Sequence, residues 1–185
     1  MKHILLFLLF ILGVSNLNAY SYAAAGKELT IDSKEAILKA VNSKDFKGAK
    51  EAFIKYEKNY KYLNDEFNEN LLEGLRVSID KKNTKDIARW LDLSIASEIQ
   101  RRLDGGLENI KKFNVAKVML AKADKFYKIL AVSLSKEQDA KLKVAIKSCI
   151  EAIGNPGLFG VGAKPINIEV YKKNQAIAIE VLKSL

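Results

Sequence analysis

The chain has 185 residues and is basic, with 31 Lys and Arg against 22 Asp and Glu and a formal net charge of +9. It contains one His, one Cys and two Pro, which excludes an intramolecular disulfide and leaves almost no imidazole for catalysis or metal binding. A chain of this length can bury the core of one ordinary domain.

The amino-terminal segment has the pattern of an export signal. Lys2 supplies a positive charge, and an apolar run from Ile4 to Val14 follows before the polar Ser15 and Asn16. This run is much shorter than the roughly 20 residues that span a bilayer as a helix. We therefore predict a cleavable signal peptide over residues 1–23, cut between residues 19 and 25, and a periplasmic or secreted product without a membrane span.

Removal of that signal would also remove His3, the only histidine. The mature chain would then lack every catalytic and metal-binding arrangement that needs imidazole, and we find no nucleophile beside a base and no cofactor motif. We expect that the protein is not an enzyme and has no cofactor. Cys149 follows Leu142 and Ile146 at the spacing of a buried helix face, which predicts a core residue, with an intermolecular disulfide or a reactive thiol as alternatives.

Only four of the basic residues are Arg, the residue type best suited to forked contacts with bases and phosphates. This composition and the predicted export argue against a nucleic-acid partner. A protein, or an anionic component of the cell envelope, remains as the expected partner.

Residues 24–185 repeat their apolar positions at three and four, which predicts one all-α domain, an irregular bundle of about six or seven helices. The expected helices cover, approximately, residues 32–42, 44–62, 65–81, 84–104, 114–134, 136–153 and 167–182. Gly105 and Gly106 are expected to end the fourth. Ser135 and Gln138 form a predicted capping box, and Val170 is expected to be buried in the last helix.

Two segments support an alternative architecture. The runs that follow Phe46 and Phe113 resemble the start of the second helix in tetratricopeptide repeats, and the two phenylalanines lie near twice the spacing of that family's repeat. This resemblance covers a small part of the chain, and the Trp, Leu-Gly and Tyr positions of the family's first helix are not matched. It implies a short array of helical hairpins.

An acidic stripe is the weak candidate for a metal site. Asp65, Glu69 and Glu73 would lie on one helix face if the third helix begins at Asn64 or Asp65, with Glu66 beside them. Carboxylates in such a stripe suit a hard cation or a cationic partner, although a solvated surface is the simpler interpretation.

Two further features are weak candidates for partner contact. Trp90, Arg101 and Arg102 belong to the fourth predicted helix, where Trp90 is either a core flank or an interface anchor. The glycine-rich loop over residues 154–165 carries Leu158 and Phe159, which either pack on the bundle or form a docking tip. The loop lacks the Lys and Ser or Thr positions of a phosphate-binding loop.

Together these patterns favour an exported helical scaffold or binding module that interacts with a protein or an envelope component. The alternative is a periplasmic helical bundle that binds a metal ion or small ligand as an accessory to transport.

Overall fold

The computed structural model describes residues 28–157 and 161–185, so the predicted signal peptide, Leu158 and Phe159 lie outside the described residues. Within these ranges the protein has seven α-helices and one short 3-10 helix, and it has no strand. The helices are α2 (Leu29–Asn42), α3 (Phe46–Glu66), α4 (Leu71–Asp80), α5 (Thr84–Glu108), α6 (Phe113–Leu130), α7 (Lys136–Ala152) and α8 (Ile168–Lys183), with η1 (Ala131–Ser133) after α6. The predicted all-α bundle is confirmed.

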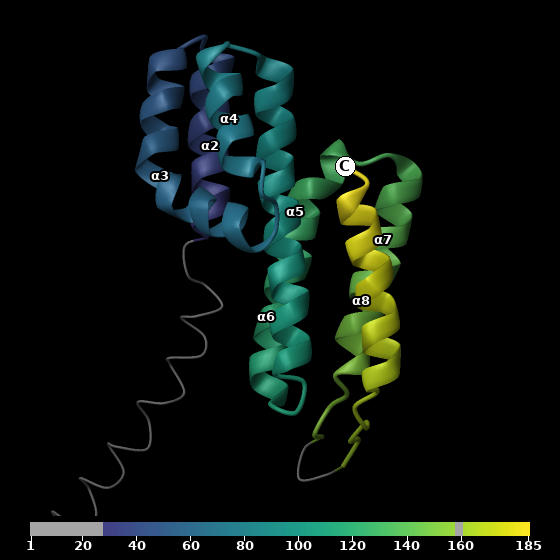
Figure 1. Ribbon diagram of the computed structural model, residues 1–185. Helices are drawn as coiled ribbons and strands as arrows, with labels where there is room; N and C mark the ends of the chain where they lie inside the picture. Colours follow the sequence, from purple (N-terminus) through teal and green to yellow (C-terminus); the bar gives the residue numbers. More distant parts are fainter. Residues whose placement is uncertain (1–27, 158–160) are drawn as a thin grey trace, which may run out of the picture.

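The helices form two packed groups that share α5 (Figure 1). The first half of α5 joins α2, α3 and α4 around a core that includes Phe53, Tyr60 and Leu91. The second half joins α6, α7 and α8 around a core that includes Phe126 and Tyr171. Ile87 and Leu91 of α5 belong to the first core, and Ile95, Ile99 and Leu103 belong to the second, so this helix of 25 residues connects the two groups.

Helix α5 runs through Gly105 and Gly106 to Glu108, so the prediction that these glycines end it is wrong. Neither glycine has a positive φ angle. Gly106 serves packing instead, because a Cβ at this position would lie 2.3 Å from the Tyr171 hydroxyl. That hydroxyl donates a hydrogen bond to the Leu103 carbonyl at 2.8 Å, which fixes α8 against α5.

Several local predictions agree with the structure. Ser135 and Gln138 form the expected capping box at the start of α7. Cys149 is completely buried, and burial raises the pKa of its thiol to about 12. It therefore packs as a small apolar residue and is not poised as a nucleophile. Phe46 and Phe113 each begin the second helix of a hairpin, but α2 and α3 have 14 and 21 residues whereas α5 and α6 have 25 and 18, so the hairpins are not regular copies.

Asp104 on α5 should reduce stability at neutral pH. Burial raises the pKa of its carboxyl, an effect that the 2.6 Å hydrogen bond from Gln175 Nε2 partly opposes. Because the folded pKa lies above the unfolded value, the neutral carboxyl favours folding, and this contribution is lost as the pH rises through the folded pKa.

We therefore expect Asp104→Asn to raise the melting temperature at neutral pH, with the gain shrinking toward about pH 4, where the unfolded carboxyl also takes up its proton. Thermal unfolding followed by circular dichroism across this pH range measures the difference in melting temperature between the variant and the unchanged protein. Glu51→Gln, at an exposed carboxyl, controls for the loss of one negative charge. A gain that grows on acidification would contradict the expectation.

Candidate functional site

Helical structure is interrupted between α3 and α4, although the sequence predicts that one continuous helix starts there. Helix α3 continues to Glu66, and α4 begins only at Leu71, so the predicted start of a helix at Asn64 or Asp65 is wrong. Asparagines stabilise the break. Asn64 Oδ1 accepts a hydrogen bond from the Leu72 backbone N–H at 3.1 Å, and Asn68 Oδ1 accepts one from the Asn70 N–H at 3.3 Å. Asparagine side chains compete for backbone groups in this way, which favours turns over helix interiors.

This α3–α4 turn forms one wall of a cleft of about 510 Å³. Residues 64–70 provide that wall, Leu93, Ala96, Ser97 and Gln100 of α5 provide the second, and Leu182 and Lys183 close the end. We call this the turn cleft. It lies where the first group of helices meets the end of α8, so neither group alone could form it. Its lining combines amide, apolar and hydroxyl side chains with three carboxylates, Asp65, Glu66 and Glu69, and one ammonium group, that of Lys183.

The structure separates the four carboxylates of the predicted acidic stripe. Asp65, Glu66 and Glu69 line the turn cleft, whereas Glu73 lies on α4 outside it and contacts Arg76 at 2.9 Å. Because the turn interrupts the helix, the four do not share one helical face. Asp65 accepts hydrogen bonds from Lys61 and Asn64, and these lower the pKa of its carboxyl.

No group of three His, Cys, Asp or Glu side chains within residues 28–157 and 161–185 is placed to hold a metal ion. Glu66 and Glu69 are exposed and form no ion pair with another described residue. They are therefore available to a cationic group that enters the turn cleft. Binding of a metal by the acidic stripe stays a prediction.

Trp90 packs within the protein. Its indole ring covers Gly74 of α4 so closely that a Cβ on Gly74 would lie 2.2 Å from the ring, and Trp90 is partly buried against the first core. The exposed Arg89 guanidinium lies 5.6 Å from the indole centroid. This geometry matches the core-flank interpretation, and the Trp90 side chain stays partly exposed.

Arg101 and Arg102, the other predicted contact residues, belong to a charged cluster beneath the surface. Glu28, Glu98 and Arg102 are all buried, with exposed fractions of 6%, 3% and 8%. Arg102 Nη2 lies 3.1 Å from Glu28 Oε2 and 3.6 Å from Glu98 Oε2. We call this set, completed by Arg101 and Lys122, the buried ion cluster.

The buried ion cluster connects the two groups of helices. Lys122 of α6 lies 2.9 Å from Glu28 Oε1, and Arg101 Nε donates to Glu98 Oε2 at 2.9 Å. Thr30 of α2 donates from Oγ1 to Glu98 Oε1 at 2.8 Å. Desolvation lowers the pKa of Arg102, an effect that the two carboxylates oppose. Because the charges are buried, they interact in a medium of low polarity and depend on one another for stability.

The sequence spacing allows Glu98 to pair with Arg101 or Arg102, but sequence reasoning missed the burial of this cluster, although one signal for it was available. Glu98 and Arg102 are four residues apart and alternate with Ile95 and Ile99 on the same buried face of α5. Charged residues inside an apolar stripe indicate a buried ion pair. Their partner Glu28 could not be identified, since it lies 74 positions before Arg102.

Comparison of the chain with protein-family models, with curated proteins and with solved structures finds no match in any of the three. Among the described residues, none of the helices combines the length and the apolar character that a membrane span requires. The functional argument therefore rests on the sites themselves.

Proposed function

We propose that the chain is an exported helical binding module that holds a cationic segment of a partner protein in the turn cleft. The observation that carries this proposal is the local reversal of charge. On a chain of net charge +9, Glu66 and Glu69 face the cleft without an ion-pair partner among the described residues. Complementary charge of this kind accelerates and orients the approach of an oppositely charged partner.

The other lining groups suit a peptide-like segment. Asn68, Asn70 and Gln100 offer amide donors and acceptors that can pair with a backbone, and Phe67 and Leu93 offer apolar contact. Ala96 is only 5% exposed, so its small side chain leaves depth in the α5 wall. A few polar groups on a partly apolar surface are the usual means of fixing an extended ligand.

The contacts of the first described residues are compatible with export. Glu28 and Thr30 make their long-range contacts with Glu98, Arg102 and Lys122, which come later in the chain. A cut between residues 19 and 25 would therefore leave these contacts intact. We expect intact-mass measurement of the protein from its own cells to give a chain that begins at one of residues 20–26.

Native mass spectrometry of the same preparation tests binding in the cleft. We expect a complex with one protein partner, and an affinity about tenfold lower for the double variant Glu66→Gln with Glu69→Gln, as two partly exposed ion pairs are lost. Glu73→Gln removes a carboxylate outside the cleft and is the matched control, with unchanged affinity. Equal affinity for both variants would refute the role of the turn cleft.

The runner-up function, a periplasmic bundle that binds a small ligand, has one specific observation in its favour. The cleft volume of about 510 Å³ lies within the range of small-molecule sites. An added mass of a few hundred daltons, roughly that of a drug-sized ligand, would favour it if the double variant also lost this mass.

A further inference from the structure

The α7–α8 connection exposes apolar side chains that nothing in the described protein covers. Every residue from 161 to 170 is exposed, and we call this segment the apolar tip. It carries Val161, Ile166, Ile168 and Val170, with exposed fractions of 79%, 40%, 37% and 40%. The prediction that Val170 is buried is wrong, because Tyr171 takes the inward position at the start of α8.

Backbone contacts between the apolar tip and the end of α7 hold the tip in a defined place. Asn155 and Lys164 exchange backbone hydrogen bonds of 2.9 and 2.8 Å, and the Asn167 N–H donates to the Ala152 carbonyl at 2.8 Å. Gly154 has a φ angle of 70°, and a Cβ there would lie 2.4 Å from the Lys164 carbonyl oxygen. The two segments of the connection therefore approach as closely as glycine permits, and the tip projects from the end of the α7–α8 pair (Figure 1).

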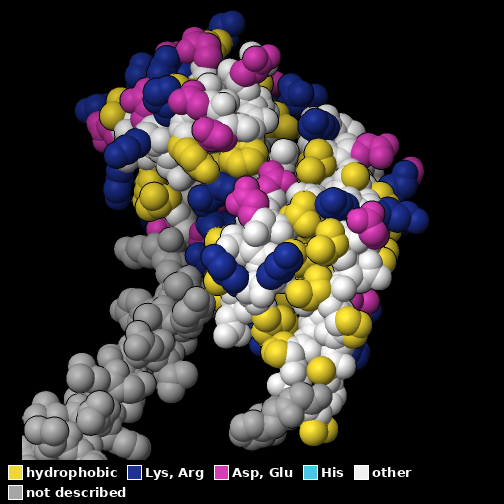
Figure 2. All heavy atoms as spheres, turned by 60° about the horizontal axis from the view of Figure 1, so that its bottom comes forward, with side chains coloured by type: hydrophobic (Ala, Val, Ile, Leu, Met, Phe, Trp, Pro, Cys, Tyr) yellow, Lys and Arg dark blue, Asp and Glu magenta, His cyan; other side chains and the backbone are white. Residues whose placement is uncertain are grey.

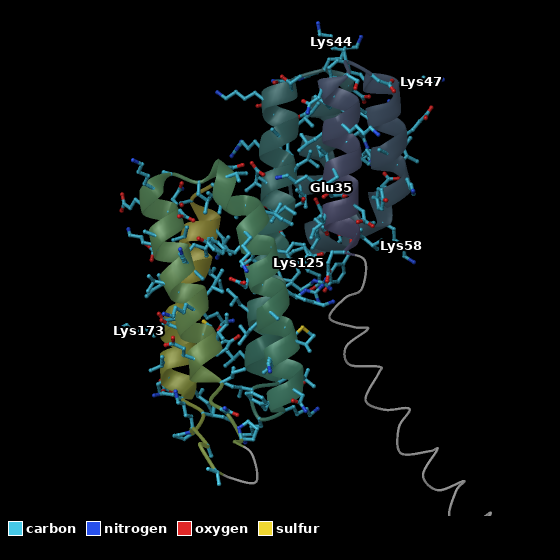
Figure 3. The ribbon with its side chains drawn as sticks, turned by 180° about the vertical axis from the view of Figure 1, so that it is seen from behind. Glu35, Lys44, Lys47, Lys58, Lys125 and Lys173 are labelled. Atoms are coloured by element: carbon cyan, nitrogen blue, oxygen red, sulfur yellow. The ribbon has the colours of Figure 1, made fainter. Side chains whose placement is uncertain are left out.

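Figure 2 shows apolar side chains gathered over this side of the molecule and down to its lower end. Lys164 belongs to the apolar tip, Lys172 and Lys173 follow it in α8, and all three are exposed. Lys173 points away from α8 in Figure 3. Lys111 and Lys112, in the α5–α6 turn, lie at the same end of the molecule (Figure 1).

The charge at this end is predominantly positive. None of these five lysines has a carboxylate within 4.0 Å in the described ranges, and the nearby acidic residues are Glu108, Glu151 and Glu169, of which Glu151 is paired with Lys147. An excess of unpaired ammonium groups around projecting apolar side chains matches the interface of an anionic bilayer, where apolar groups enter the acyl boundary and lysines contact headgroups.

We propose that the apolar tip inserts into the surface of an anionic lipid membrane, with the surrounding lysines on the headgroups, so that the protein binds membranes peripherally. A fluid bilayer accepts a convex tip without a preformed pocket. The lysines select the anionic surface, since each ammonium group near such a surface favours binding. The inference does not depend on the turn cleft, which is formed by other residues.

Co-sedimentation of the mature protein with vesicles tests the proposal. We expect binding to vesicles of phosphatidylcholine mixed with phosphatidylglycerol, little binding to phosphatidylcholine alone, and a steep fall with added salt. The double variant Ile166→Ser with Ile168→Ser should bind at least about tenfold more weakly, as two apolar side chains no longer leave water. Each of Lys164→Gln, Lys172→Gln and Lys173→Gln should cost about fivefold.

The other end of the second group of helices, where η1 joins α6 to α7, provides matched controls. Val132, in η1, is 86% exposed, and Lys136 is exposed at the start of α7. Val132→Ser and Lys136→Gln should bind vesicles like the unchanged protein. Unchanged circular dichroism of all variants shows that the fold is retained.

Three results would overturn the proposal: no binding to anionic vesicles, equal binding by the tip variants and the controls, or a dimer mass that only the tip variants lose, which would assign the tip to self-association. The variant Glu66→Gln with Glu69→Gln should still bind vesicles, so failure of the membrane proposal and failure of the cleft proposal are distinguishable.

Discussion

Replacement of Arg102 by Ala should lower the free energy of unfolding by about 3–5 kcal/mol. Arg102 is only 8% exposed and lies between two buried carboxylates, Glu28 and Glu98. Without the guanidinium these carboxylates keep fewer partners in a medium that solvates charge poorly. The interaction of the guanidinium with the Phe126 ring, whose centroid lies 5.9 Å from it, is also lost. Urea denaturation followed by circular dichroism measures the loss.

Arg101→Ala is the matched control, because Arg101 binds the same Glu98 but its side chain is 30% exposed. We expect it to cost about 1 kcal/mol or less, as water replaces much of the interaction. A double-mutant cycle with Arg102→Ala and Glu28→Ala should show strong coupling, since the two residues share one ion pair. Equal losses for the two arginine variants would show that the burial of Arg102 does not set the size of its contribution to stability.

Phe126→Ala should cost a similar amount, about 3–5 kcal/mol, because a completely buried aromatic ring leaves a cavity that rigid helices cannot fill. Urea denaturation again measures it. Phe113→Ala, at a partly buried phenylalanine that begins the same helix, is the control and should cost clearly less.

The same experiment tests how the two cores are joined. Trp90, the only tryptophan, packs against the first core, whereas Phe126 lies in the second. We expect Trp90 fluorescence and circular dichroism to report one common transition, shifted together by Phe126→Ala, because α5 and the buried ion cluster belong to both groups. An unshifted fluorescence midpoint would mean that the two groups unfold separately.

Three of the four carboxylates in the predicted acidic stripe line one cleft, and their use as a binding site stays a prediction. Asp65, Glu66 and Glu69 are brought together in the turn cleft, but Glu73 is not, because the asparagine-rich turn separates α3 from α4. The asparagines are visible in the sequence. Whether a helix starts or ends there depends on which backbone N–H groups donate hydrogen bonds to the Asn64 and Asn68 side chains. Trp90 was placed on the correct helix, and its position over Gly74 follows from the packing of α4 on α5.

The sequence by itself determined the helical class, most helix positions, the capping box at Ser135 and the buried character of Cys149, because these depend on residues within a few turns of one another. Tertiary structure decided the rest. Helix α5 continues through Gly106, where the Tyr171 hydroxyl packs against the glycine. Val170 is exposed, and Glu28 contacts Arg102 although the two residues are 74 positions apart. Such contacts arise from the packing of whole helices, and no local pattern encodes which distant side chain will meet a given face.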